Sequence, residues 1–405
     1  MTDSPMPGTR RLREGEFVSL MALVVALVAV SIDTMLPAFP RIAAELSPDA
    51  PNRVPLILSV FLLSLGVGTF FTGPLSDSFG RIRVINFGFA LFALGSVLAW
   101  LAPTLDLLLL ARALQGLGAA APRVVGTAII RDLYEGRSMA RITSFVMTVF
   151  MLVPAAAPLL GQGIMAISGW REIFVMLVLF ALVSASWLNL RQPETLPAAA
   201  RRPFRAGVLK RGVVEVVRNR KAMRYILVLT LIFAALFSVL SVIQPVYDRT
   251  FGRGDSFAYW FMATAVVSAT GTVLNAALVM RLGMRRLATQ AMGGLAVFAL
   301  LFTGIELAGT GQGTLGFALF FIFTSGVLLS TGLIIGNLNA LALQPLGHVA
   351  GLAASLISAA STIGSALLSV PVVLAFDGTP RSLMVGITLF AGLGWLLMRD
   401  SRDHE

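Results

Sequence analysis

Along this chain, extended runs of hydrophobic residues alternate with short polar segments. A helix of about twenty residues spans the hydrocarbon core of a bilayer, because each residue adds about 1.5 Å along the helix axis. Runs of that length cover residues 17–38, 54–73, 84–102, 105–130, 143–166, 172–190, 224–246, 257–280, 287–307, 314–338, 349–375 and 382–398. The pattern therefore predicts an all-α integral membrane protein with twelve transmembrane helices.

Composition supports lipid as the surrounding medium. Hydrophobic residues make up 57% of the 405 positions and charged residues only 13%, whereas charged residues are about 25% of a typical soluble protein. Cysteine is absent, and histidine occurs only at His348 and His404. This argues against disulfides, zinc or iron–sulfur sites, and nucleophilic catalysis by cysteine or by serine with histidine. We therefore expect no metal site, no cofactor and no enzymatic activity.

The net charge of +11 has an uneven distribution over the two sides of the predicted spans. Most Lys and Arg residues outside the spans fall in the N-terminal segment, in the loops that follow even-numbered spans, and in the C-terminal segment. Cytoplasmic loops of membrane proteins carry this excess of positive charge, so both termini are predicted to be cytoplasmic. The basic surplus is an orientation signal, and we expect no nucleic-acid partner.

The longest polar segment lies between the sixth and seventh spans, where Lys and Arg recur and three prolines interrupt any continuous helix. A short amphipathic helix over residues 207–222 could lie there on anionic lipid. The predicted organisation is a cytoplasmic N-terminus at 1–16, a first six-helix bundle at 17–190, a cytoplasmic linker at 191–223, a second six-helix bundle at 224–398, and a cytoplasmic tail at 399–405.

A short charged turn joins the second and third spans, so these two helices must lie side by side. Its glycines are Gly73 and Gly80, and its charges include Asp77, Arg81 and Arg83. Gly73 permits close approach of a neighbouring helix, and Gly80 permits the positive φ of a tight turn. Asp77 can accept hydrogen bonds from Arg81 or from a helix N-terminus. We interpret this turn as a cytoplasmic gate that holds helices in one state and releases them in another.

The fourth span contains two arginines, which are costly in a membrane unless they face protein or water. Arg112 lies about 10 Å deep, with Gln115 one turn further along. Arg123 follows eleven residues after Arg112, three turns plus about 20°, so it lies on the same helix face. Two interpretations of Arg123 remain open. It faces a cavity for an anionic or zwitterionic substrate, or its side chain extends to the cytoplasmic interface.

The first span holds the only carboxylate that lies clearly inside a predicted helix, Asp33, about 8 Å from the outer end. An ionisable residue within the membrane marks a functional site, so we predict a proton-binding role for Asp33. Arg112 enters to a similar depth from the same face, and we expect the two to pair directly or through water. In the second half, Gln244 continues a helical row of polar residues and is a further candidate for the substrate cavity.

Three segments resemble the major facilitator superfamily. The turn at 73–84 resembles the signature loop between its second and third helices. The segment 108–120, with Arg112, Gln115 and four small residues, resembles its proton-antiporter motif. In the fifth span, Pro154, Pro158 and Gly161 stand where a second antiporter motif is expected. This resemblance implies two six-helix bundles that enclose a midplane cavity.

Two further segments, 31–40 and 193–196, resemble the bicyclomycin-resistance (Bcr/CflA) drug-efflux subfamily. This resemblance implies a multi-pass protein of the bacterial inner membrane that exports small amphiphilic compounds in exchange for protons, acting as a monomer. Asp33 and Arg112 would couple transport to protons, and Asp33, Arg112, Gln115, Arg123 and Gln244 would contact substrate. The alternative is a dedicated importer or exporter of one metabolite on the same fold.

Overall fold

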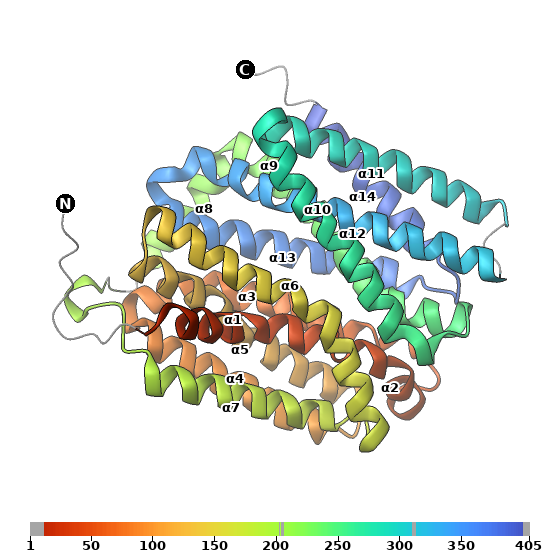
Figure 1. Ribbon diagram of the computed structural model, residues 1–405, viewed down its shortest axis with the longest axis horizontal. Coiled ribbons are helices and arrows are strands. Elements are labelled where there is room, and N and C mark those ends of the chain that lie inside the picture. The colour runs from red at the N-terminus through yellow and green to blue at the C-terminus, as the bar shows by residue number, and fades with distance from the viewer. Residues whose placement is uncertain (1–11, 202, 204–205, 310–312, 400–405) are drawn as a thin grey trace.

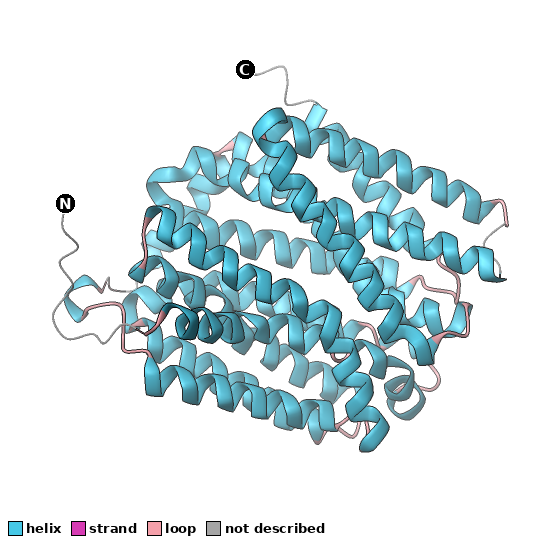
Figure 2. Cartoon of the chain, in the orientation of Figure 1, coloured by secondary structure: helices cyan, strands magenta, loops and turns pink. Residues whose placement is uncertain are grey.

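The protein is represented by a computed structural model that describes residues 12–201, 203, 206–309 and 313–399. Within these ranges every regular element is a helix (Figure 2). Twelve helical segments are long and apolar enough to cross a membrane, so the predicted transmembrane architecture is confirmed for the described residues.

The long helices are α1 (Glu14–Asp33), α3 (Leu56–Phe79), α4 (Arg81–Trp100), α5 (Leu105–Leu133), α6 (Gly136–Ile167), α7 (Glu172–Arg191), α9 (Arg220–Pro245), α10 (Phe257–Leu282), α11 (Met284–Leu307), α12 (Gly313–Leu343), α13 (Ala350–Leu374) and α14 (Arg381–Arg399). The shorter ones are η1 (Leu36–Ala38), α2 (Phe39–Leu46), η2 (Pro51–Arg53), η3 (Ala198–Ala200), α8 (Ala206–Arg218), η4 (Val246–Thr250), η5 (Gly254–Ser256) and η6 (Gln344–Val349).

The outward faces of the long helices are apolar. Phe87 on α4, for example, leaves 69% of its surface uncovered, and similar Leu, Val and Phe side chains are exposed on most of the other long helices. Water-soluble proteins rarely expose large continuous apolar areas. The surface therefore fits hydrocarbon, and polar side chains are concentrated inside the bundle or at its ends.

Small residues bring the helices of the first half into close contact around α5. A Cβ added to Gly116 would lie 2.2 Å from the carbonyl oxygen of Phe61 on α3, and one added to Gly118 would lie 2.4 Å from the backbone nitrogen of Phe92 on α4. No side chain fits at such distances, so glycine allows α3 and α4 to pack on α5 backbone to backbone. The segment that resembles the antiporter motif is thus also the packing centre of its half.

The two halves meet along two helix pairs, α3 with α13 and α6 with α10. In the first pair, a Cβ on Gly66 would lie 2.7 Å from Ile363. Next to the second pair, Gln162 Nε2 on α6 donates to the carbonyl oxygen of Asp255 at 2.6 Å, in the short helix η5 that precedes α10. Figure 1 shows α6 and α10 approaching each other toward the end that carries α2 and separating toward the other end.

We name the two ends of the bundle by what they carry. The linker end holds the α3–α4 turn and the segment between α7 and α9, and the opposite end holds α2 and η4 (Figure 1). At the opposite end, the Asn52 side chain donates to the carbonyl oxygen of Phe376 and accepts from Arg249 Nη1 at 3.4 Å. Polar contacts therefore join the two halves at this end.

Candidate functional site

A cavity of about 650 Å³ lies between the two halves. Its wall is mainly apolar and aromatic, with Phe150, Phe233, Phe237 and Phe261 among the lining residues. The polar lining residues are Asp33, Thr69, Arg123, Thr127, Ser268, Thr331, Asn339, Ser355 and Ser358. The cavity extends from Asp33 to the last turns of α12 and the first turns of α13, and so it reaches the linker end. This combination suits a small amphiphilic molecule.

Asp33 lies in the cavity wall at the point where the first membrane helix breaks. The predicted continuous helix over 17–38 ends at Asp33, and the chain turns through Thr34 and Met35 into η1. Pro37 and Pro40 contribute to this break, because proline lacks a backbone N–H and disturbs the preceding turn. Among the described residues no side chain is hydrogen-bonded or ion-paired to the Asp33 carboxylate. A buried carboxylate at an interrupted membrane helix is an arrangement suited to binding a proton or a substrate.

Helix α6 packs directly against the break. A Cβ added to Gly161 would lie 2.1 Å from the carbonyl oxygen of Thr34, so the glycine allows α6 to touch the backbone next to Asp33. Pro154 lines the cavity, whereas Pro158 is buried one turn further along. Both prolines lie inside the continuous helix α6, where each removes one backbone donor.

We expect Gly161→Ala to force α6 away from Thr34 and to destabilise the protein by about 1–3 kcal/mol, the usual cost of overpacking. Thermal unfolding in detergent measures the effect. Gly163→Ala is a matched control, because it lies on the same helix with no atom within 4 Å of an added Cβ. Equal unfolding temperatures for the two variants would contradict the importance of this contact.

Arg112 is buried, and its partners are not those expected. Its Nη1 donates to Ser31 Oγ at 2.9 Å and to Gln115 Oε1 at 2.8 Å, and its guanidinium lies 4.3 Å from the centre of the Phe61 ring. The pairing with Asp33 was expected to be direct or through water, and among the described residues no direct contact between the two side chains occurs. Ser31 and Asp33 are two residues apart and so point about 200° apart around α1. One faces α5, and the other faces the cavity.

Gln115 extends this buried polar chain. Its Nε2 donates to Ser96 Oγ on α4 at 2.6 Å, and Ser96 Oγ donates to the carbonyl oxygen of Phe92 at 2.9 Å. Arg112 and Gln115 are not among the residues that line the cavity. Gln244 is likewise buried outside the lining, and its Oε1 has no hydrogen-bond partner within the described residues. These three residues are therefore buried between packed helices and do not face the cavity.

Arg123 is half-buried and lines the cavity, so the structure favours the first of its two interpretations. It follows Pro122 on α5, and no ion pair to it occurs among the described residues. Asp33 and Arg123 are the two charged residues in the lining as far as the structure describes it. The cavity thus offers one acidic and one basic side chain within an otherwise uncharged and mainly apolar wall.

At the linker end, Arg81 is the centre of an ion-pair cluster that we call the α3–α4 latch, consisting of Ser76, Asp77, Arg81 and Asp132. Arg81 Nη1 donates to Asp77 Oδ1 at 2.5 Å and to Ser76 Oγ at 2.7 Å, and Arg81 Nε donates to Asp132 Oδ2 at 2.9 Å. The side chains of Arg81 and Asp132 are only 6% and 17% exposed, whereas that of Asp77 is 49% exposed. The most buried ion pair in the cluster is therefore Arg81 with Asp132, a residue that the sequence interpretation did not include.

The glycines of the turn have the geometry that was expected, and Arg83 does not join the latch. Gly80 has φ 99°, a conformation that side-chain-bearing residues rarely adopt. A Cβ on Gly73 would lie 2.8 Å from Ser355 Oγ, so this glycine allows α3 to approach α13 of the other half. The Arg83 side chain is exposed. A second cavity of about 120 Å³ separates the latch from the first turn of α13.

Glu194 in the linker fixes the start of α4. Its Oε1 accepts from the backbone N–H of Arg81 at 2.9 Å, and its Oε2 accepts from that of Ile82 at 3.2 Å. A carboxylate at a helix N-terminus satisfies otherwise unpaired N–H groups and interacts favourably with the helix dipole. Thr195 Oγ1 donates to Asp132 Oδ2 at 3.0 Å, so the linker also reaches the latch. The resemblance at 193–196 was the only sequence signal for this role.

In the part of the chain that the structure describes, twelve membrane-length helices form two halves around a central cavity that reaches one end, which is the architecture of a membrane transporter and not of an enzyme. Residues 21–369 match the profile of the Major Facilitator Superfamily, and the chain belongs to this family.

Several relatives are similar over most of the chain. It is 28% identical over 350 residues to an uncharacterized MFS-type transporter, YdgK, of Bacillus subtilis, covering 84% of this chain and 83% of that protein. It is 28% identical over 342 residues to the bicyclomycin resistance protein homolog of Haemophilus influenzae, covering 84% of each. It is also 28% identical over 357 residues to the multidrug resistance protein MdtL of Shewanella oneidensis, covering 85% of each.

Solved structures share the fold. A D-xylose-proton symporter superimposes with a TM-score of 0.76 at 15% identity, over 95% of this chain and 97% of that one. The human organic anion transporter MFSD10 superimposes with a TM-score of 0.65 at 17% identity, over 96% of this chain and 100% of that one. At such low identity, the similarity establishes the fold and not the transported substrate.

Proposed function

We propose that the protein is a proton-coupled antiporter that exports small amphiphilic compounds across the bacterial inner membrane by alternating access. The observation that carries this proposal is the cavity, which is mainly apolar and whose described lining contains a single carboxylate, Asp33, with no protein partner among the described residues. The names of two similar proteins, which refer to bicyclomycin and multidrug resistance, support drug-like substrates. Because one chain encloses the whole cavity, a monomer suffices for transport.

In this mechanism Asp33 is the proton site, and a substrate in the cavity competes with the proton for its carboxylate. Arg112 acts indirectly, because its hydrogen bonds to Ser31 hold the segment of α1 that carries Asp33. Movement of α1 relative to α5 would change the surroundings of Asp33 and alter its affinity for protons. Competition between proton and substrate then yields exchange.

Alternating access in this proposal is a movement of the two halves about the α3–α13 and α6–α10 contacts. The distribution of Lys and Arg supports a cytoplasmic linker end with both termini in the cytoplasm. The cavity reaches that end, while Asn52 and Gln162 join the halves at the opposite end. This arrangement suits a state that receives substrate from the cytoplasm.

The direct test is transport by the purified protein in proteoliposomes with an imposed pH gradient. A fluorescent amphiphile should accumulate on the side from which protons leave, and collapsing the gradient should stop accumulation. Accumulation in the same direction as proton flow would contradict antiport and favour a dedicated importer. Transport that ignores the gradient would refute proton coupling.

Arg123 provides a test of how the cavity recognises charge. We expect Arg123→Gln to lower transport of anionic and zwitterionic amphiphiles by on the order of tenfold, because a hydrogen bond to a charged group contributes about 1.5–3 kcal/mol. Cationic amphiphiles should be transported at least as well as before. Arg137→Gln is the control, because this arginine is exposed and lies outside the cavity. A uniform loss for all substrates would argue against recognition by Arg123.

A further inference from the structure

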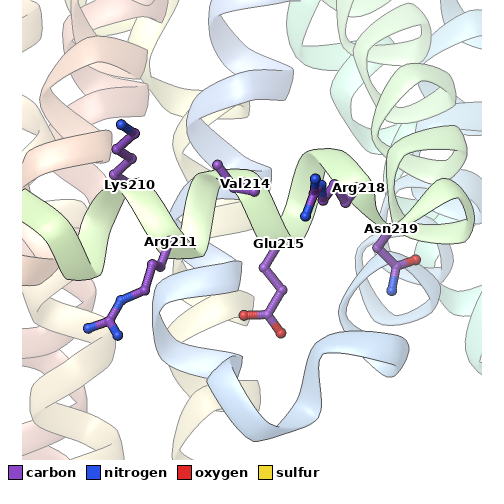
Figure 3. A pocket seen from close by; sticks show the side chains of 6 residues that line it. All are labelled: Lys210, Arg211, Val214, Glu215, Arg218 and Asn219. Atoms are coloured by element: carbon purple, nitrogen blue, oxygen red, sulfur yellow. The ribbon is translucent and has the colours of Figure 1, made fainter.

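Helix α8 packs against α13 and α9 at the linker end, and Figure 3 shows it crossing the neighbouring helices. Its inner face is seated on α13. A Cβ added to Gly212 would lie 2.3 Å from Leu352 Cδ2, and Val216, one turn further along, is buried. The position of α8 is therefore fixed by packing, and its axis follows the expected plane of the membrane surface.

The outer face of α8 combines cations with apolar side chains. Lys210, Arg211 and Arg218 are exposed, and no ion pair to them occurs among the described residues. Between them Val214 and Val217 are 41% and 57% exposed. Lys210 and Val214 project to one side of the helix in Figure 3, and Arg211 and Glu215 project to the other.

A hollow of about 540 Å³ runs along this face, lined by Lys210, Arg211, Val214, Glu215, Arg218 and Asn219. Three of these residues are basic and one is acidic, so the wall attracts anions. Two more cations, Arg220 and Lys221, follow at the start of α9 and are also exposed. A cluster of four to eight Lys and Arg residues next to a membrane helix is characteristic of anionic lipid binding.

We infer that this surface, formed by Lys210, Arg211, Val214, Val217 and Arg218, binds the headgroups of anionic phospholipids. The basic side chains contact the phosphates, and the two valines enter the boundary between headgroups and acyl chains, as in helices that lie in the membrane interface. A soluble acidic partner would not require exposed valines interleaved with the cations. The inference does not depend on which solute the protein transports.

The site can be tested by lipid binding to the full-length protein in neutral detergent, measured by native mass spectrometry. Phosphatidylglycerol should bind more tightly than phosphatidylcholine. The triple change Lys210→Ala, Arg211→Ala, Arg218→Ala should weaken phosphatidylglycerol binding by on the order of tenfold or more. Each cation near an anionic surface contributes to the binding free energy, and the variant loses three of them. The seat on α13 is untouched, so the unfolding temperature without added lipid should not change.

Two control proteins sharpen this test. The triple change Arg137→Ala, Arg281→Ala, Arg286→Ala removes equal charge from exposed positions elsewhere and should retain binding. Val214→Gln with Val217→Gln keeps all the cations and should still weaken lipid binding. Three outcomes would overturn the inference, because each removes the need for a lipid site on α8. The two triple charge variants could lose lipid binding equally, or the two lipids could bind equally well. Soluble glycerol phosphate could also compete for the site as well as the lipid does.

Discussion

Asp33→Asn is expected to abolish proton-driven accumulation of substrate while leaving substrate binding measurable. Asparagine has nearly the same size and cannot exchange a proton, so it removes the chemistry with little change in packing. The carboxylate lines the cavity at the end of α1 and has no partner among the residues that the structure describes. We expect at least a tenfold loss of gradient-driven transport in proteoliposomes, with substrate exchange across the membrane retained in the absence of a gradient.

The control for Asp33 is Glu306→Gln. Glu306 is also buried, but it lies near the end of α11, at 3.7 Å from Arg381, and it is not part of the cavity lining. Removing the charge of Glu306 should leave the coupling between proton movement and substrate transport intact. Undiminished coupled transport by Asp33→Asn would refute the proton-site assignment, and equal losses in both variants would indicate a general effect of removing buried charge.

Arg81→Ala is expected to have the second large effect, on both stability and transport. It would leave Asp132 without its cation near the linker end. Removing one partner of a buried ion pair typically costs about 3–5 kcal/mol, and the low end applies here because Asp132 is partly exposed and keeps its hydrogen bond from Thr195. Because Asp77 is half-exposed, its ion pair adds little to that loss. We therefore expect a destabilisation of roughly 3 kcal/mol, visible as a lower unfolding temperature in detergent, together with impaired transport.

Two comparison variants distinguish loss of the α3–α4 latch from a general effect of removing charge. Arg83→Ala removes the same charge from an exposed position in the same turn and should change stability by less than about 0.5 kcal/mol. Asp77→Asn should be milder than Arg81→Ala, because the Asp77 side chain is more exposed than that of Asp132. If Arg83→Ala were as harmful as Arg81→Ala, the latch would not have the role we assign to it.

The sequence predicted the number and positions of the membrane helices, because crossing a bilayer imposes a length and a composition that are visible in each apolar run. It also predicted the need for glycine at Gly73 and Gly80. The break of α1 at Asp33 was missed, although Pro37 and Pro40 were present, because the residues around them remain apolar. Hydropathy reports which residues enter the membrane and not whether the helix continues through them.

The partners of side chains were harder to predict from the sequence than the depth of residues in the membrane. The rise per residue placed Asp33 and Arg112 at similar depths, but the direction of each side chain around its helix depends on how α1 and α5 pack. In the structure Arg112 meets Ser31, and Asp33 faces the cavity. The roles of Asp132 and Glu194 depend on contacts between residues 51 and 113 positions apart, and no local pattern predicts such contacts.

The capping of α4 by Glu194 has a consequence for any attempt to produce the halves as separate polypeptides. The first bundle, as an autonomous fragment, does not end where its sixth membrane helix ends, because Glu194 and Thr195 complete contacts inside that half. A first polypeptide cut at residue 190 would lack the group that satisfies the backbone of Arg81 and Ile82. Co-expressed fragments divided after residue 200 would keep that group with the bundle it serves.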